Sequence, residues 1–71
     1  MSNKEKALEI LEEHIENFSL DYADNFRVAN MNSQADMDAF EEQAMNGCCG
    51  SYETEINING ETWMIGCNYG H

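Results

Sequence analysis

Residues 51–68 read SYETEININGETWMIGCN and predict a β-hairpin. The dipeptide Asn59-Gly60 is typical of a two-residue type I′ turn, because both of its positions tolerate a positive φ. Apolar and polar residues alternate on either side of this dipeptide, as they do in strands with one buried face. We therefore expect strands at about residues 51–58 and 61–68.

The turn also fixes the register of the hairpin and separates its side chains into two faces. Ile58 pairs with Glu61, and the pairing continues along both strands as far as Tyr52 opposite Cys67. One face is largely apolar and comprises Tyr52, Thr54, Ile56, Ile58, Trp63, Ile65 and Cys67. The other face comprises Glu53, Glu55, Asn57, Thr62, Met64 and Asn68. Such a division is expected of a hairpin that packs on helices.

A helix is predicted near the N-terminus. Ser2 and Glu5 match a capping box, in which each side chain bonds the backbone N–H of the other residue. Beyond them, apolar side chains recur at helical spacing and form one stripe: Ala7, Leu8, Leu11, Ile15 and Phe18. Glutamates form the opposite stripe, so we expect one face to pack on the domain and the other to meet solvent or a partner. His14 lies beside the apolar stripe and is expected to be a half-buried, hydrogen-bonded side chain.

A second helix is predicted at residues 34–46. Ser33 is the expected N-cap, and Asp36 occupies the reciprocal capping position. The apolar face of this helix holds Met37, Phe40 and Ala44. Gly47 directly follows Asn46 and is a typical C-terminal stop.

The segment between the two helices leaves two element orders open. Residues 19–32 predict a loop followed by a short strand near residues 26–30. With that strand the order is αβαββ, and we expect the strand to run parallel to residues 51–58 with the second helix as the crossover. Without it the order is ααββ. In both cases residues 1–71 form a single α+β domain, in which two amphipathic helices pack on a small sheet containing the C-terminal hairpin.

Charge restricts the classes of partner. Fourteen acidic residues stand against Lys4, Lys6 and Arg27, which gives a formal net charge of -11. Direct binding to nucleic acid is therefore not expected, because contacts to phosphates need lysine and arginine. The excess of carboxylates leaves basic proteins, metal cations or simple solubility as its uses.

The glutamates of the first helix are the candidate partner-binding residues: Glu5, Glu9, Glu12, Glu13 and Glu16. Their carboxylates recur about every 6 Å along the helix, a distance similar to that between successive phosphates of a nucleic-acid strand. A row with this spacing can occupy a groove built for phosphates, so mimicry of nucleic acid is one mode of binding to a basic protein. An ordinary solvated helix face is the alternative interpretation.

The cysteines support a different hypothesis, a structural zinc site. Cys48, Cys49, Cys67 and His71 form a Cys₃His set, which zinc accepts. Three observations count against this site. Adjacent cysteines point to opposite sides of an extended chain, the sequence has no C-x-x-C spacing, and straight strands separate Cys48 from Cys67 by about 13 Å. The alternative is that these cysteines are small buried apolar residues, and the role of the turn at residues 47–50 stays open.

Catalysis is not expected. A nucleophilic cysteine would need a base and an electropositive setting, whereas this chain is acidic. The sequence also contains no phosphate-binding glycine loop and no calcium-binding loop. No segment approaches the ~20 apolar residues of a membrane span, and the N-terminus does not read as a signal peptide. We therefore expect a cytoplasmic protein without a membrane partner and with reduced cysteines.

The C-terminal segments GCCGSYE (47–53) and IGCNYGH (65–71), together with Asn59-Gly60 between them, resemble the C-terminal ends of small uncharacterised proteins of tailed bacteriophages. The resemblance covers the last third of the chain. It implies an accessory protein made in the cytoplasm of an infected bacterium, where small acidic proteins often bind and block a host protein.

Three functional hypotheses follow. The leading one is an acidic protein-binding module that inhibits or modulates a basic host protein. The alternative is a zinc-binding mini-domain built on the cysteine-rich C-terminal part. The third is a homodimer formed through an exposed edge of the hairpin, along either residues 51–58 or residues 61–67.

Overall fold

The structure, a computed structural model, describes residues 2–20, 22–45 and 50–70. Its elements follow the order αβαββ, so the predicted short strand is confirmed and the order ααββ is excluded. In chain order they are α1 (Asn3–Asn17), β1 (Asp24–Asn30), α2 (Gln34–Ala44), β2 (Ser51–Ile58) and β3 (Glu61–Asn68). Strand β1 begins two residues before the expected position.

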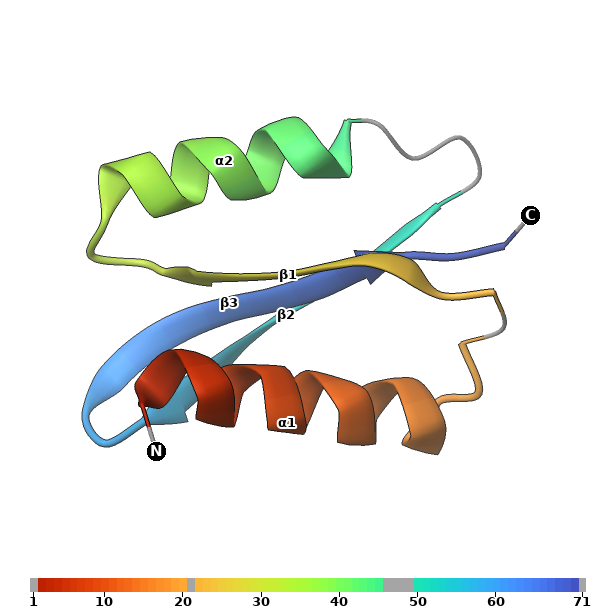
Figure 1. Ribbon diagram of the computed structural model, residues 1–71, viewed down its shortest axis with the longest axis horizontal. Helices are drawn as coiled ribbons and strands as arrows, with labels where there is room; N and C mark the ends of the chain where they lie inside the picture. The colour runs from red at the N-terminus through yellow and green to blue at the C-terminus, as the bar shows by residue number, and fades with distance from the viewer. Residues whose placement is uncertain (1, 21, 46–49, 71) are drawn as a thin grey trace.

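The three strands form one antiparallel sheet with the order β1-β3-β2. Strands β2 and β3 form the predicted hairpin, with Ile58 opposite Glu61 and Tyr52 opposite Cys67. Asn59 and Gly60 have φ values of 50° and 86°, as the type I′ turn requires. Strands β1 and β2 run in the same direction, but they are not neighbours because β3 lies between them (Figure 1). The long central strand β3 is therefore not an edge, and β2 is the edge of the hairpin.

Helix α1 covers one face of the sheet, the apolar face of the hairpin (Figure 1). The main core lies between them and consists of Ala7, Leu11, Ile58, Trp63 and Ile65, with Ile10, Ile15, Val28 and Ile56 packed around it. The residues that α1 contributes belong to the predicted apolar stripe or to its border. Apolar residues spaced at the helical period of 3.6 and at the strand period of two thus supply the two sides of one core layer.

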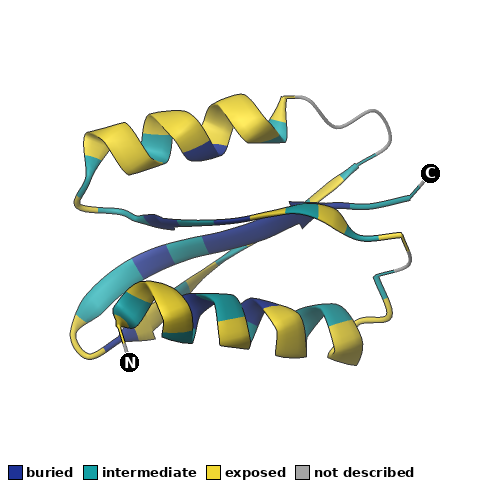
Figure 2. Cartoon of the chain, in the orientation of Figure 1, coloured by how far each residue is buried: buried dark blue, intermediate teal, exposed yellow. Residues whose placement is uncertain are grey.

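Helix α2 covers the opposite face, so the sheet lies between the two helices. It packs chiefly against β1, where the buried Phe40 lies over the guanidinium of Arg27. The part of this face that belongs to β2 is exposed at Glu53, Glu55 and Asn57 (Figure 2). The face that reads as polar in the sequence is therefore half covered and half open.

Both predicted helix starts are confirmed. The hydroxyl Oγ of Ser2 accepts a hydrogen bond from the backbone N–H of Glu5, and that of Ser33 accepts one from Asp36, each at 3.2 Å. Helix α2 ends at Ala44, with Met45 as its C-cap. It is two residues shorter than predicted, and the expected stop at Asn46 and Gly47 lies outside the described residues.

A polar network joins three elements at the turn end of the hairpin. The carboxylate of Glu61 accepts hydrogen bonds from the side chains of Asn3 on α1, Asn30 on β1 (3.2 Å) and Trp63 on β3 (3.4 Å). The bonds from Asn3 and Trp63 lower the pKa of Glu61, because they favour its charged form. This network connects the start of α1 with the sheet.

Candidate protein-binding surface

The five predicted glutamates of α1 are all exposed: Glu5, Glu9, Glu12, Glu13 and Glu16. The helix turns Ala7 and Leu11 into the core, and the glutamates belong to its exposed positions (Figure 2). The sequence therefore correctly placed these side chains on a solvent-facing surface of a packed helix.

The glutamates of α1 are each other's neighbours. Glu9 lies four residues from both Glu5 and Glu13, and Glu12 lies four residues from Glu16. Like charges at this spacing destabilise a helix by about 0.2–0.5 kcal/mol per pair. Within the described ranges no ion pair with a lysine or arginine neutralises them. The surface thus concentrates negative charge at some expense in helix stability.

One of the three cations lies inside the protein. Arg27 is only 7% exposed and lies under Phe40, with the guanidinium carbon 4.8 Å from the ring centre. Its Nη1 donates hydrogen bonds to Oδ1 of Asn68 at 2.9 Å and to the backbone oxygen of Asn25 at 3.2 Å. Its Nη2 lies 3.5 Å from a carboxylate oxygen of Glu53. This burial could not be predicted from the sequence, because arginine is mostly a surface residue.

The burial of Arg27 increases the imbalance of charge outside. Lys4 and Lys6 are then the remaining basic side chains, and both belong to the first half of α1. Exposed carboxylates continue beyond α1 onto α2 and β2, where the sequence had not singled them out: Asp36, Asp38, Glu41, Glu42, Glu53 and Glu55. The acidic surface is therefore larger than the predicted five residues.

The structure places one member of the predicted zinc set. Cys67 is completely buried in β3, and burial raises the pKa of its thiol. Cys48, Cys49 and His71 lie outside the described residues, as does most of the turn at residues 47–50. Among the residues that are described, no group of three or more His, Cys, Asp or Glu side chains could hold a metal ion. The zinc hypothesis stays a prediction.

His14 is half-buried, as expected, and takes part in a small aromatic cluster. Its Nδ1 lies 2.8 Å from the hydroxyl oxygen of Tyr52, and its ring packs against Phe18 with the centres 5.8 Å apart. The ring of Phe18 also packs on that of Tyr52. The cluster fastens the end of α1 to the first residues of β2. Burial, followed by the neighbouring Cys67, raises the pKa of the Tyr52 hydroxyl.

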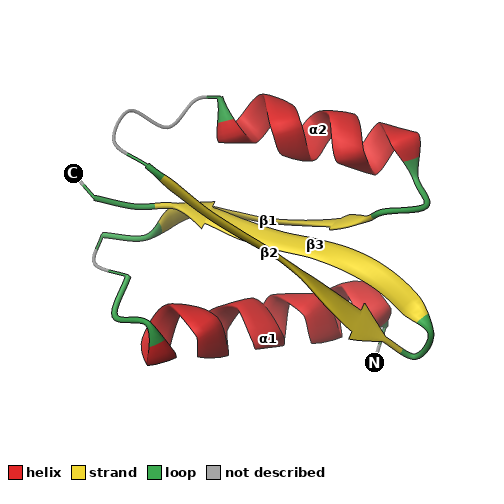
Figure 3. Ribbon diagram, turned by 180° about the vertical axis from the view of Figure 1, so that it is seen from behind, coloured by secondary structure: helices red, strands yellow, loops and turns green. Residues whose placement is uncertain are grey.

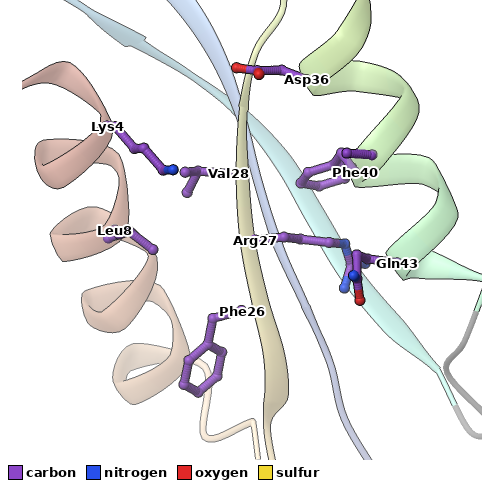
Figure 4. Close-up of a pocket in the computed structure, with 9 residues that line it drawn as sticks. Lys4, Leu8, Phe26, Arg27, Val28, Asp36, Phe40 and Gln43 are labelled. Atoms are coloured by element: carbon purple, nitrogen blue, oxygen red, sulfur yellow. The ribbon is translucent and has the colours of Figure 1, made fainter.

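An open pocket of about 360 Å³ lies beside the outer edge of β1, between the two helices (Figure 4). Lys4 and Leu8 line it from α1, and Asp36, Phe40 and Gln43 line it from α2. Neither Cys67 nor any of the five predicted glutamates contributes to its lining. Among the described residues, the pocket is thus separate from the five glutamates and from Cys67.

No helix within the described ranges is long and apolar enough to cross a bilayer. Comparison with known protein families, with curated proteins and with solved structures found no match for this chain.

Proposed function

We propose that this chain is a small acidic protein-binding module whose α1 glutamates engage a basic surface of another protein. The observation that carries the proposal is the row of five exposed carboxylates on a rigid helix, without a neutralising ion pair in the described part of the chain. A partner that supplies lysines and arginines would remove the repulsion among these carboxylates. Binding would therefore gain from relief of that repulsion as well as from attraction.

The resemblance of the C-terminal segments to phage proteins suggests the setting. A protein made in an infected bacterium would meet host proteins, and a basic nucleic-acid enzyme has the complementary charge. The regular spacing of the α1 carboxylates would let them take the place of phosphates in its groove. In this proposal the protein inhibits or modulates the host protein by occupying that groove.

The test is affinity capture from bacterial lysate with two charge-matched variants. One carries E9K, E12K and E16K on α1, and the other carries D38K, E41K and E42K on α2. Each substitution adds two positive charges, so both variants have a formal charge of -5 instead of -11. Circular dichroism and thermal melting would establish that both variants fold.

The proposal predicts that wild type and the α2 variant retain a basic protein at low salt and release it at high salt, since screening weakens attraction between exposed charges. The α1 variant should not retain it. Equal retention by all three proteins would contradict the role of α1. Equal loss in both variants would show that net charge alone is responsible.

A further inference from the structure

The two edges of the sheet differ in how much backbone they leave open. In an antiparallel ladder, residues alternate between those that bond their neighbour and those that turn N–H and C=O outward. The backbone N–H of Met31 donates to the carbonyl oxygen of Thr62. On β1, Asn30 and every second residue before it therefore turn their N–H and C=O outward. The N–H of Tyr69 donates to Gly50, so on β2 the residues in phase with Ser51 face outward.

The edge of β1 is blocked at both ends. The outward N–H of Asn30 donates to the carboxylate of Asp36 at 3.2 Å, and its carbonyl oxygen accepts from Ser33 at 2.9 Å. At the other end the register shifts between Asp24 and Arg27, where Asn25 has a φ of 53°. Bulges and caps of this kind are how proteins prevent an edge from pairing with another strand.

The edge of β2 is long and regular. Its eight residues pair with β3 in unbroken register, and no further strand of the described sheet lies on the other side (Figure 3). Every second residue of β2 therefore turns its backbone N–H and C=O outward: Ser51, Glu53, Glu55 and Asn57. An open row of this length is a template for an additional strand.

From this geometry we infer that the β2 edge accepts an extended basic segment of the partner as a fourth, antiparallel strand. Since the inference names the part of a basic partner that binds, it rests on the proposed function. The residues directly opposite Glu53 and Glu55 would project onto the half of the sheet that α2 leaves open. Lysine or arginine at these two positions matches the carboxylates, because oppositely charged cross-strand pairs stabilise a sheet.

The position between the two basic residues is expected to be apolar. Side chains alternate across a sheet, so this residue would project to the α1 side. There it would lie beside Thr54 and Ile56, which are only half-buried in the free chain. The edge thus selects the alternating pattern basic–apolar–basic in an extended chain.

A second copy of this chain fits the same edge poorly. In the fully overlapped antiparallel pairing, Glu53 of one copy lies opposite Glu55 of the other, and the same pair occurs twice. Like charges directly opposite each other destabilise a sheet. Arg27 forms an ion pair with Glu53, whereas no ion pair in the described ranges compensates the charge of Glu55. A basic segment is favoured over self-association for this reason.

The test uses the full chain and two synthetic seven-residue peptides in which lysine alternates with valine. The second peptide carries methyl groups on the backbone nitrogens of its two central lysines, which removes two donors but no charge. We expect the plain peptide to slow amide hydrogen exchange at Glu53, Glu55 and Asn57. The methylated peptide should bind about tenfold more weakly, as expected for two lost hydrogen bonds.

Two variants of the protein separate backbone from charge. E55P removes the carboxylate together with one outward N–H, and an edge strand tolerates the loss of that N–H because the group has no ladder partner. E55Q removes the charge alone and keeps the N–H, so the difference between the two variants reports the backbone hydrogen bond. We expect E55P to weaken the plain peptide strongly at all salt concentrations. E55Q should weaken it severalfold at low salt only.

Equal binding of the two peptides, or no binding of either, would overturn the strand inference. If the two peptides bound equally and slowed amide exchange only in α1, the proposed function would still stand, since the α1 and α2 charge variants test that function independently. Protection of the β2 amides without peptide, together with a doubled molecular mass, would overturn the inference in favour of a second copy at this edge.

Discussion

Replacing Gly66 with alanine is the change that tests the packing of the sheet most sharply. Gly66 is buried on the α2 side of β3, between Arg27 on β1 and Glu53 on β2. The absence of a side chain there lets Arg27 reach across β3 toward Glu53, with Phe40 packed above. A methyl group would occupy the space that this arrangement uses.

The size of the effect follows from the contacts of the added methyl carbon. It would lie 2.6 Å from the backbone oxygen of Tyr52, 2.9 Å from Cζ of Phe40 and 3.2 Å from Cγ of Glu53. The nearest atom belongs to the backbone of a paired strand and cannot move alone. We therefore expect a loss of about 3 kcal/mol in the free energy of unfolding, the upper part of the range for overpacked cores. In a domain of this size such a loss lowers Tm by more than about 10 °C.

Urea unfolding monitored by circular dichroism measures this loss, and Gly60→Ala is the matched control. Gly60 has a φ of 86° but no atom within 4 Å of an added methyl carbon. Its variant should therefore lose only about 1 kcal/mol, from backbone strain alone. A Gly66→Ala protein within 1 kcal/mol of wild type, or one more stable than Gly60→Ala, would refute the described packing of Phe40 and Glu53 around Gly66.

Three further predictions concern charge and pH. Glu13→Gln removes repulsion from Glu9 and Glu16 and should stabilise the fold by about 0.4–1 kcal/mol in thermal melts at low salt; an unchanged or lower Tm would contradict this. Hydrogen bonds lower the pKa of Glu61, so its stabilising contribution should be present above about pH 4.5 and disappear as pH falls through its folded pKa. Glu61→Gln should make the free energy of unfolding less dependent on pH in this acid range, and an unaltered pH dependence would argue against the network. Burial raises the pKa of Cys67, so its contribution to stability should be complete below about pH 9 and decline as pH rises toward its folded pKa. Cys67→Val should lessen the decline, and an identical alkaline profile would count against a buried thiol.

The features that could be predicted from the sequence depend on short-range chemistry. Asn59-Gly60 permits the left-handed backbone of a type I′ turn, and that alone fixes the register from Ile58 to Tyr52. The caps at Ser2 and Ser33 depend on a side chain and an N–H three residues away. The outward orientation of the α1 glutamates follows from the helical period. Each of these needs no knowledge of distant parts of the chain.

The features that could not be predicted depend on long-range pairing. Packing decides whether β1 pairs with β2 or with β3, and that choice determines which edge of the hairpin stays open. Helix α2 packs on β1 with Phe40 over the buried Arg27, a residue type that is mostly found on protein surfaces. The burial of Arg27 requires Gly66 on the neighbouring strand and Glu53 beyond it. No local pattern in the sequence connects these three residues.

Binding of a basic partner is proposed to depend on the α1 carboxylates and not on net charge alone. The most direct test is calorimetric titration of the captured partner with wild type, with the E9K/E12K/E16K variant and with the D38K/E41K/E42K variant at one low salt concentration. We expect the α2 variant to keep its Kd within about fivefold of wild type and the α1 variant to bind at least about a hundredfold more weakly, because several charge-assisted contacts are removed. Equal Kd values for the two variants would contradict it.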